Sequence, residues 1–113
     1  MNNMGNRASR DIKFGVIGCS GIGQLHAKVI CEAEGTQLVA VSDPTEQIAK
    51  SLAGKYRADW YTENERLLAR KDIDVVCICT PSGTHADIGI QAAQARKHVL
   101  VEKPMDVTLG KAD

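Results

Sequence analysis

The sequence predicts an α/β fold, a doubly wound parallel β-sheet with helices on both of its faces. Short apolar runs alternate with amphipathic segments along the 113 residues, and this alternation is typical of βαβ units. The connections are short, and the first apolar run ends in a cluster of glycines, as a buried strand does when it turns directly into a helix. Because such crossovers are right-handed, the pattern predicts the strand order 3-2-1-4-5.

Strands are predicted where apolar residues gather between turn signals. The predicted strands cover residues 12–17, 37–42, 59–61, 74–80 and 98–102. The fourth run is the most apolar, which indicates a central strand buried on both faces. Cys77 and Cys79 lie two residues apart in it, so they should face the same side of the sheet and cannot easily form a disulfide.

Helices are predicted between these strands from their apolar spacing and from start and stop signals. The first covers residues 22–33. The second is predicted to begin at Pro44, with Asp43 or Thr45 as its cap, and to close near Gly54.

The later helices carry weaker signals. Thr62 and Glu65 form a Thr-x-x-Glu capping box for a brief third helix. A fourth helix is predicted to end at Arg96 and Lys97, because their charges suit the negative carboxyl end of a helix. Its inner face is predicted to consist of Ile88, Ala92 and Ala95. A last helix is predicted to begin near Thr108.

Length and charge narrow the classes of function. Residues 11–113 are long enough for one domain with one core, and the polar residues 1–10 are expected to be a disordered leader. They lack the apolar segment of a secretory signal. Lys plus Arg equals Asp plus Glu, 14 each, so neither a nucleic-acid-binding stripe nor a polybasic membrane patch is expected. No apolar run approaches the roughly 20 residues of a membrane span.

The four cysteines fit neither a disulfide framework nor a zinc site, because the sequence has no Cys-x-x-Cys pair. We therefore expect no metal. Reduced thiols in a core indicate a cytoplasmic protein.

A glycine loop follows the first strand. The dinucleotide-binding fingerprint is Gly-x-Gly-x-x-Gly; here Gly18 and Gly23 match its ends, Ser20 stands in the middle, and the extra glycine is Gly21. Backbone amides at the start of the next helix, with the positive end of its dipole, favour a pyrophosphate. The Ser20 hydroxyl could donate to a phosphate oxygen. The alternative is a glycine-rich turn that binds nothing.

Asp43 ends the second strand, twenty residues after Gly23. A carboxylate in this place accepts hydrogen bonds from ribose hydroxyls and repels a 2′-phosphate, which favours NAD over NADP. The alternative is that Asp43 only caps the second helix.

Two further candidates follow the fourth and fifth strands, at the carboxyl edge of the predicted sheet where ligands bind in such folds. Lys103 is held extended by Pro104, and its ammonium could assist proton transfer near a nicotinamide and a substrate hydroxyl. Alternatively, Lys103 is a solvated surface lysine. His85 follows a Pro-Ser-Gly turn and is either a site residue or a half-exposed residue at a helix start.

Three segments together resemble the Gfo/Idh/MocA oxidoreductases, which include glucose–fructose oxidoreductase and inositol 2-dehydrogenase. The segments are Gly-Val-Ile-Gly-Cys-Ser-Gly-Ile-Gly-Gln-Leu-His-Ala at 15–27, Thr80-Pro81-x-x-x-His85, and Lys-His-Val-Leu-Val-Glu-Lys-Pro at 97–104. The resemblance covers nearly the whole chain beyond the leader. It implies an NAD(P)-binding Rossmann domain followed by a larger α/β domain that holds the substrate. The chain stops at Asp113, so the sixth strand and the C-terminal domain are expected to be missing.

The resemblance also implies residue roles. The pyrophosphate would lie on Gly18, Ser20, Gly21, Ile22 and Gly23. The ribose would bind Asp43, and Thr80, Pro81 and His85 would line the cofactor. Glu102 and Lys103 would lie beside the nicotinamide and the substrate, with Lys103 catalytic.

The implied function is that of the cofactor-binding part of an NAD-dependent oxidoreductase, with NADP less favoured. The substrate would be a sugar, a polyol or a related hydroxyl compound held by the missing domain. The protein is expected to be a homo-oligomer with no nucleic-acid or membrane partner, and the 113-residue chain to bind cofactor without turnover. The alternatives are an NAD-dependent glycoside hydrolase or lyase, and a non-catalytic dinucleotide sensor of the same family.

Overall fold

The computed structural model describes residues 11–80 and 85–101 of the chain. Its elements follow one another as β1 (Ile12–Ile17), α2 (Ile22–Glu32), β2 (Thr36–Ser42), α3 (Glu46–Tyr56), β3 (Asp59–Tyr61), α4 (Asn64–Leu68), β4 (Val75–Ile78), α5 (His85–Gln94) and β5 (His98–Val101). The strands form one sheet in the order β3-β2-β1-β4-β5, and every neighbouring pair is parallel. The predicted fold class and strand order are therefore confirmed.

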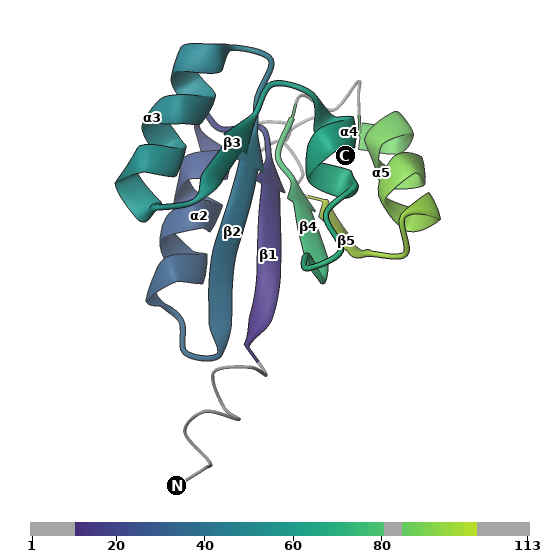
Figure 1. The fold of residues 1–113 in the computed structure, drawn as a ribbon, viewed down its shortest axis with the longest axis horizontal. Helices are drawn as coiled ribbons and strands as arrows, with labels where there is room; N and C mark the ends of the chain where they lie inside the picture. Colours follow the sequence, from purple (N-terminus) through teal and green to yellow (C-terminus); the bar gives the residue numbers. More distant parts are fainter. Residues whose placement is uncertain (1–10, 81–84, 102–113) are drawn as a thin grey trace, which may run out of the picture.

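Helices cover both faces of this sheet (Figure 1). Val16 of β1 packs in a core with α2 and α3, whereas its neighbour Ile17 packs in a second core with α4 and α5. The same alternation divides β4, where Cys77 faces the first core and Ile78 the second. Both central strands are thus buried on both faces, as parallel strands between helix layers must be.

The start of α3 differs from the prediction. Pro44 is not its first residue, because Asp43 Oδ1 accepts a hydrogen bond from the Thr45 amide at 2.9 Å and holds a turn before the helix. The helix begins at Glu46 with Thr45 as its N-cap, and the Thr45 side chain makes no capping hydrogen bond.

Two further helix boundaries were predicted wrongly. Gly54 lies inside α3, which continues to Tyr56 and stops at Arg57, a residue in the left-handed conformation (φ 60°). The Thr62 capping box does not form: the N-cap of α4 is Glu63, without a side-chain hydrogen bond. Its carbonyl accepts from the Arg66 amide at 3.2 Å instead.

Lys97 also departs from its predicted role. Its ammonium does not cap the carboxyl end of α5. It donates to the carbonyl oxygens of Arg70 (2.5 Å) and Ile73 (3.1 Å), which lie between α4 and β4. The predicted inner face of α5 is confirmed at Ile88 and Ala92, which are both buried.

Candidate functional site

The glycine loop joins β1 to α2 at the carboxyl edge of the sheet. The Gly18 amide donates to the Ser42 carbonyl at 2.8 Å, and the Cys79 amide donates to the Ile17 carbonyl at 2.8 Å. These bonds hold Gly18 between the ends of β2 and β4, with a positive φ of 97°. A Cβ added at Gly18 would lie 2.8 Å from the Cys79 carbonyl carbon, so the tight turn needs glycine.

The other two glycines of the loop differ in how closely other atoms pack against them. A Cβ at Gly23 would lie 1.7 Å from the Gly18 carbonyl oxygen, which means that glycine alone lets α2 start this close to β1. Gly21 has a positive φ of 52° but no atom within 4 Å of an added Cβ. The loop is therefore tightly packed at Gly18 and Gly23 and open at Gly21.

The loop leaves backbone donors free. Within the described part of the chain, the amides of Ser20, Gly21 and Ile22 have no hydrogen-bond partner, whereas the Gly23 amide donates to the Ser20 carbonyl at 3.0 Å. These amides lie at the amino end of α2, where the helix dipole is positive. Adjacent free amides over an open glycine fit a diphosphate.

Asp43 is tied to the same loop. It is 8% exposed, and its Oδ2 accepts a hydrogen bond from the Cys19 amide at 2.9 Å while Oδ1 accepts from Thr45. The carboxylate therefore does not act as the cap of α3, the alternative considered above. Each carboxylate oxygen can accept a further bond, so both retain capacity for ribose hydroxyls.

Cys19 lies in the loop but is not suited to act as a nucleophile. Its thiol donates to the Ser42 carbonyl at 3.2 Å. Burial, and then the neighbouring Asp43 and Cys79, raise the pKa of Cys19 to about 12. At neutral pH it stays a thiol, which is the unreactive form.

A cavity of about 300 Å³ opens at this edge. Its lining includes Gly18, Ser20, Asp43, Asn64, Thr80 and Ile88. The structure thus brings together the glycine loop, the acid after β2 and the residue two places beyond β4. Asn64, the first residue of α4, was missed by the sequence interpretation because it belongs to no motif. The strand order alone could have pointed to it, since β3 also ends at this edge.

The remaining predicted site residues are not described at the level of side chains. His85 begins α5, and only its backbone is described. Pro81, Glu102 and Lys103 lie outside the described residues. Their roles stay predictions.

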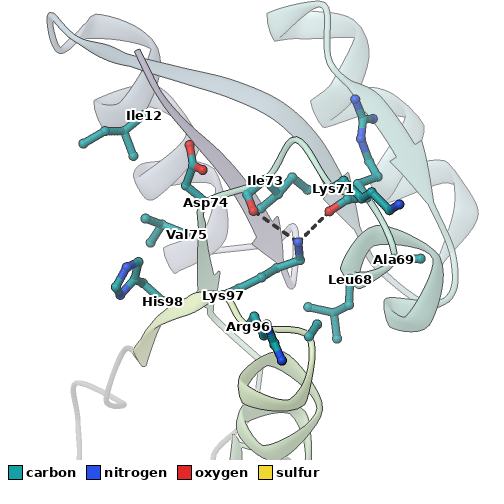
Figure 2. A pocket seen from close by; sticks show the side chains of 12 residues that line it. Ile12, Leu68, Ala69, Lys71, Ile73, Asp74, Val75, Arg96, Lys97 and His98 are labelled. Atoms are coloured by element: carbon teal, nitrogen blue, oxygen red, sulfur yellow. Dashed lines mark hydrogen bonds between the residues drawn. The ribbon is translucent and has the colours of Figure 1, made fainter. Parts of the chain in front are cut away.

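A larger cavity, of about 790 Å³, lies at the opposite edge, where β1, β4 and β5 begin. Figure 2 shows the Lys97 ammonium directed at backbone carbonyls between α4 and β4. Burial lowers the pKa of Lys97, against the opposing influence of Asp72 and Asp74.

Arg70, also on this lining, is held by carboxylates. It bonds to Asp59 at 2.5 Å and to Asp72 at 2.8 Å. Hydrogen bonds to Asp72 and Asp59 raise the pKa of Arg70, and the bond from Arg70 lowers the pKa of Asp72. Lys97 and Arg70 are thus engaged by the protein itself, so we do not assign the functional site to this larger cavity.

The described ranges contain neither a candidate metal site nor a membrane-spanning helix. No group of three His, Cys, Asp or Glu side chains in residues 11–80 and 85–101 could hold a metal ion. None of Cys19, Cys31, Cys77 and Cys79 forms a disulfide in these ranges. No helix in those ranges has the length and apolarity needed to cross a bilayer.

Comparisons with known proteins show which family the chain resembles. Inositol 2-dehydrogenase from Rhizobium meliloti is 40% identical over 96 residues, which are 85% of this chain and 29% of that protein. The structure of myo-inositol dehydrogenase from Lactobacillus casei with NAD(H) and myo-inositol superposes with a TM-score of 0.78 at 29% identity, covering 83% of this chain and 29% of that one. Biliverdin reductase from Synechocystis, in complex with biliverdin and NADP+, gives a TM-score of 0.78 at 27% identity, covering 84% and 30%.

The chain thus spans less than a third of the length of these relatives. A family model described as the oxidoreductase family with an NAD-binding Rossmann fold matches residues 12–113. The strand order, the glycine loop and this match together show that the chain belongs to the Gfo/Idh/MocA oxidoreductase family, as part of its NAD-binding Rossmann domain.

Proposed function

We propose that this chain binds NAD for an oxidoreductase that acts on a sugar, a polyol or a related hydroxyl compound. The observation that carries the proposal is the joining of the glycine loop to Asp43 by the 2.9 Å hydrogen bond from the Cys19 amide. This bond joins the loop that we propose for the diphosphate to the carboxylate that we propose for the ribose. The dehydrogenase from Rhizobium meliloti and the complex from Lactobacillus casei support the class of substrate.

Each group at the edge has a proposed part in binding. The free amides of Ser20, Gly21 and Ile22 donate to the diphosphate, and Asp43 accepts hydrogen bonds from the adenosine ribose. Asp43 is buried, and among the described residues its carboxylate pairs with backbone amides and with no cation, so a 2′-phosphate beside it would be repelled. Similarity of fold does not choose between the two cofactors, because a structural relative was crystallised with NADP+. The proposed preference for NAD therefore rests on the Asp43 carboxylate.

The proposed chemistry needs residues beyond the described ones. Bound NAD supplies a hydride acceptor at its nicotinamide ring. Thr80, Pro81, His85 and Glu102 are proposed to line the cofactor, and Lys103 to move a proton at the substrate oxygen, as the family resemblance implies. We expect the 113-residue chain to bind NAD without turning over substrate, because its relatives are about three times longer.

Titration of the chain with NAD and with NADP, followed by amide NMR, tests the proposal. NAD should shift the amide signals of residues 18–23 and bind more tightly than NADP. Asp43→Asn should weaken NAD binding by about tenfold or more, since a hydrogen bond to a charged acceptor contributes roughly 1.5–3 kcal/mol. Asp59→Asn, which neutralises an exposed acid at the other edge, should leave NAD affinity unchanged. A folded chain whose loop signals do not move would refute the assignment.

The proposed homo-oligomer has a candidate contact at β5. This strand is the outermost one of the described sheet, and its Leu100 and Val101 are 52% and 47% exposed. Exposed apolar residues on an edge strand favour association with another chain. Sedimentation should therefore show a concentration-dependent dimer, and Leu100→Lys should shift it to monomer. A monomer at every concentration would refute this contact.

A further inference from the structure

A buried serine holds an amide at the wall of the proposed nucleotide cavity. Ser42 ends β2 and is fully buried, and its hydroxyl donates to Asn64 Oδ1 at 2.9 Å. The Ser42 carbonyl accepts from the Gly18 amide and from the Cys19 thiol. One residue therefore connects the glycine loop to the first turn of α4, on the far side of β2.

The bond to Ser42 decides which end of the Asn64 amide stays available. A carboxamide has one acceptor oxygen and one nitrogen with two N–H donors. Because the hydroxyl of Ser42 binds the oxygen, the two donors on Nδ2 remain. Among the described residues, Nδ2 has no acceptor, although Asn64 is half-buried and lines the cavity.

The other groups in the cavity limit what these donors can bind. Asp43 is part of the same lining, so a phosphate bound between Asn64 and this carboxylate, away from the free amides of the glycine loop, would be repelled. Ile88 and Cys79 add apolar surface, which suits a flat heterocycle. A volume of about 300 Å³ is at the small end of ligand pockets, appropriate to a nucleoside rather than to a whole dinucleotide.

We propose that Asn64 Nδ2 donates a hydrogen bond to a ring nitrogen of the adenine base, and that Ser42 is the positioning residue that orients the amide. The inference rests on the proposed NAD binding and adds a hydrogen bond that recognises the adenine base. A ribose held by Asp43 is one glycosidic bond from its base, so the base is within reach of the cavity lining that Asp43 shares with Asn64. The ring nitrogens of adenine accept hydrogen bonds and match the free donors.

The first experiment measures the affinity of the 113-residue chain for ADP by calorimetry, in the wild type and in Asn64→Asp. Aspartate keeps the shape of the side chain and still accepts from Ser42, but it cannot donate when ionised. We expect ADP binding to weaken about tenfold, the equivalent of one hydrogen bond. Glu65→Gln, an exposed neighbour on α4, is the matched control and should bind ADP like the wild type.

The second experiment identifies the bond itself with ADP analogues that lack one ring nitrogen: 1-deaza-, 3-deaza- and 7-deaza-ADP. In the wild type, one of them should bind about tenfold more weakly than ADP, again by the loss of one hydrogen bond. In Asn64→Asp the same analogue and ADP should bind equally, because the donor is already gone. This coupling does not depend on the added charge, which affects all four ligands alike.

Ser42→Ala tests the positioning role. It should reduce the discrimination against that analogue, a readout that a merely structural serine would not move, while urea unfolding shows that the variant remains folded. If the wild type binds no ADP, both this inference and the proposed function fail. If the wild type binds ADP but Asn64→Asp binds it equally, or if all three analogues bind like ADP, only the Asn64 contact is refuted.

Discussion

The two edges of the sheet use their polar groups in opposite ways. At the carboxyl edge, the amides of residues 20–22 and the amide nitrogen of Asn64 remain without partners among the described residues. At the amino edge, the Lys97 ammonium is bound by two carbonyls and Arg70 by two carboxylates. The amino edge nevertheless has the larger cavity. In this fold, unused hydrogen-bonding capacity therefore marks the candidate site better than cavity volume does.

The largest expected effect is at Gly23. Gly23→Ala would place a Cβ 1.7 Å from the Gly18 carbonyl oxygen, so the turn between β1 and α2 must shift. We expect the free energy of unfolding to fall by roughly 3–5 kcal/mol, as for other severe backbone conflicts. Urea unfolding measures the loss, and NAD titration of any folded fraction should show no binding. A variant of wild-type stability and affinity would contradict the tight packing of this loop.

Lys97→Met tests whether a change at the amino edge of the sheet lowers stability without affecting NAD binding at the carboxyl edge. It leaves the Arg70 and Ile73 carbonyls without the ammonium and should lower the free energy of unfolding by about 1–3 kcal/mol, the usual effect of leaving buried acceptors unpaired. NAD affinity of the folded variant should stay within about twofold of the wild type, because a structural change at the other edge acts independently over such separations. A large loss of NAD affinity in a folded Lys97→Met chain would show that the edges are coupled.

Gly54→Ala should stabilise the fold, whereas Gly23→Ala and Lys97→Met should destabilise it. Gly54 lies inside α3 with no atom within 4 Å of an added Cβ. Alanine should raise the free energy of unfolding by about 0.5–1 kcal/mol, because it removes the cost of a mid-helix glycine. The thermal midpoint should rise accordingly; a fall would mean that α3 is not a regular helix at this position.

The smallest effect is a pH dependence at the amino edge. The pKa of Lys97 is lowered by burial below its ordinary value of 10.5, so the unfolded chain binds more protons than the folded chain between the two values. The free energy of unfolding should therefore rise with pH between the folded pKa and 10.5. This contribution is lost when the pH falls below the folded pKa. Subtracting the same curve for Lys97→Met isolates this contribution. Parallel curves for the two proteins would show that Lys97 does not contribute.

The elements that the sequence predicted well are those with strong patterns. The bounds of β1 and β3 match the prediction, and so do the strand order and the buried faces of β4. Apolar runs between turn signals report burial directly, and a sheet has few ways to connect its strands. The placement of Asp43 beside the glycine loop followed from the same topology.

The predictions that failed depended on which of several nearby side-chain or backbone groups forms the hydrogen bond at a helix terminus. Pro44 and Thr62 carried ordinary helix-start signals, but the Asp43 carboxylate and the Glu63 carbonyl set the starts of α3 and α4. Arg57 ends α3 in the left-handed conformation, where Gly54 had seemed the better stop. The hydrogen-bond partners of Asn64 and Lys97 lie 22 to 27 positions away in the sequence. No local sequence pattern predicts such contacts.

The double engagement of Asp43 has a consequence for recognition. Because the Cys19 and Thr45 amides each donate to one of its two oxygens, the carboxylate is held in place before any ligand arrives. A ribose that binds there does not have to freeze a mobile side chain, so this acceptor is pre-organised and the entropic cost of association falls.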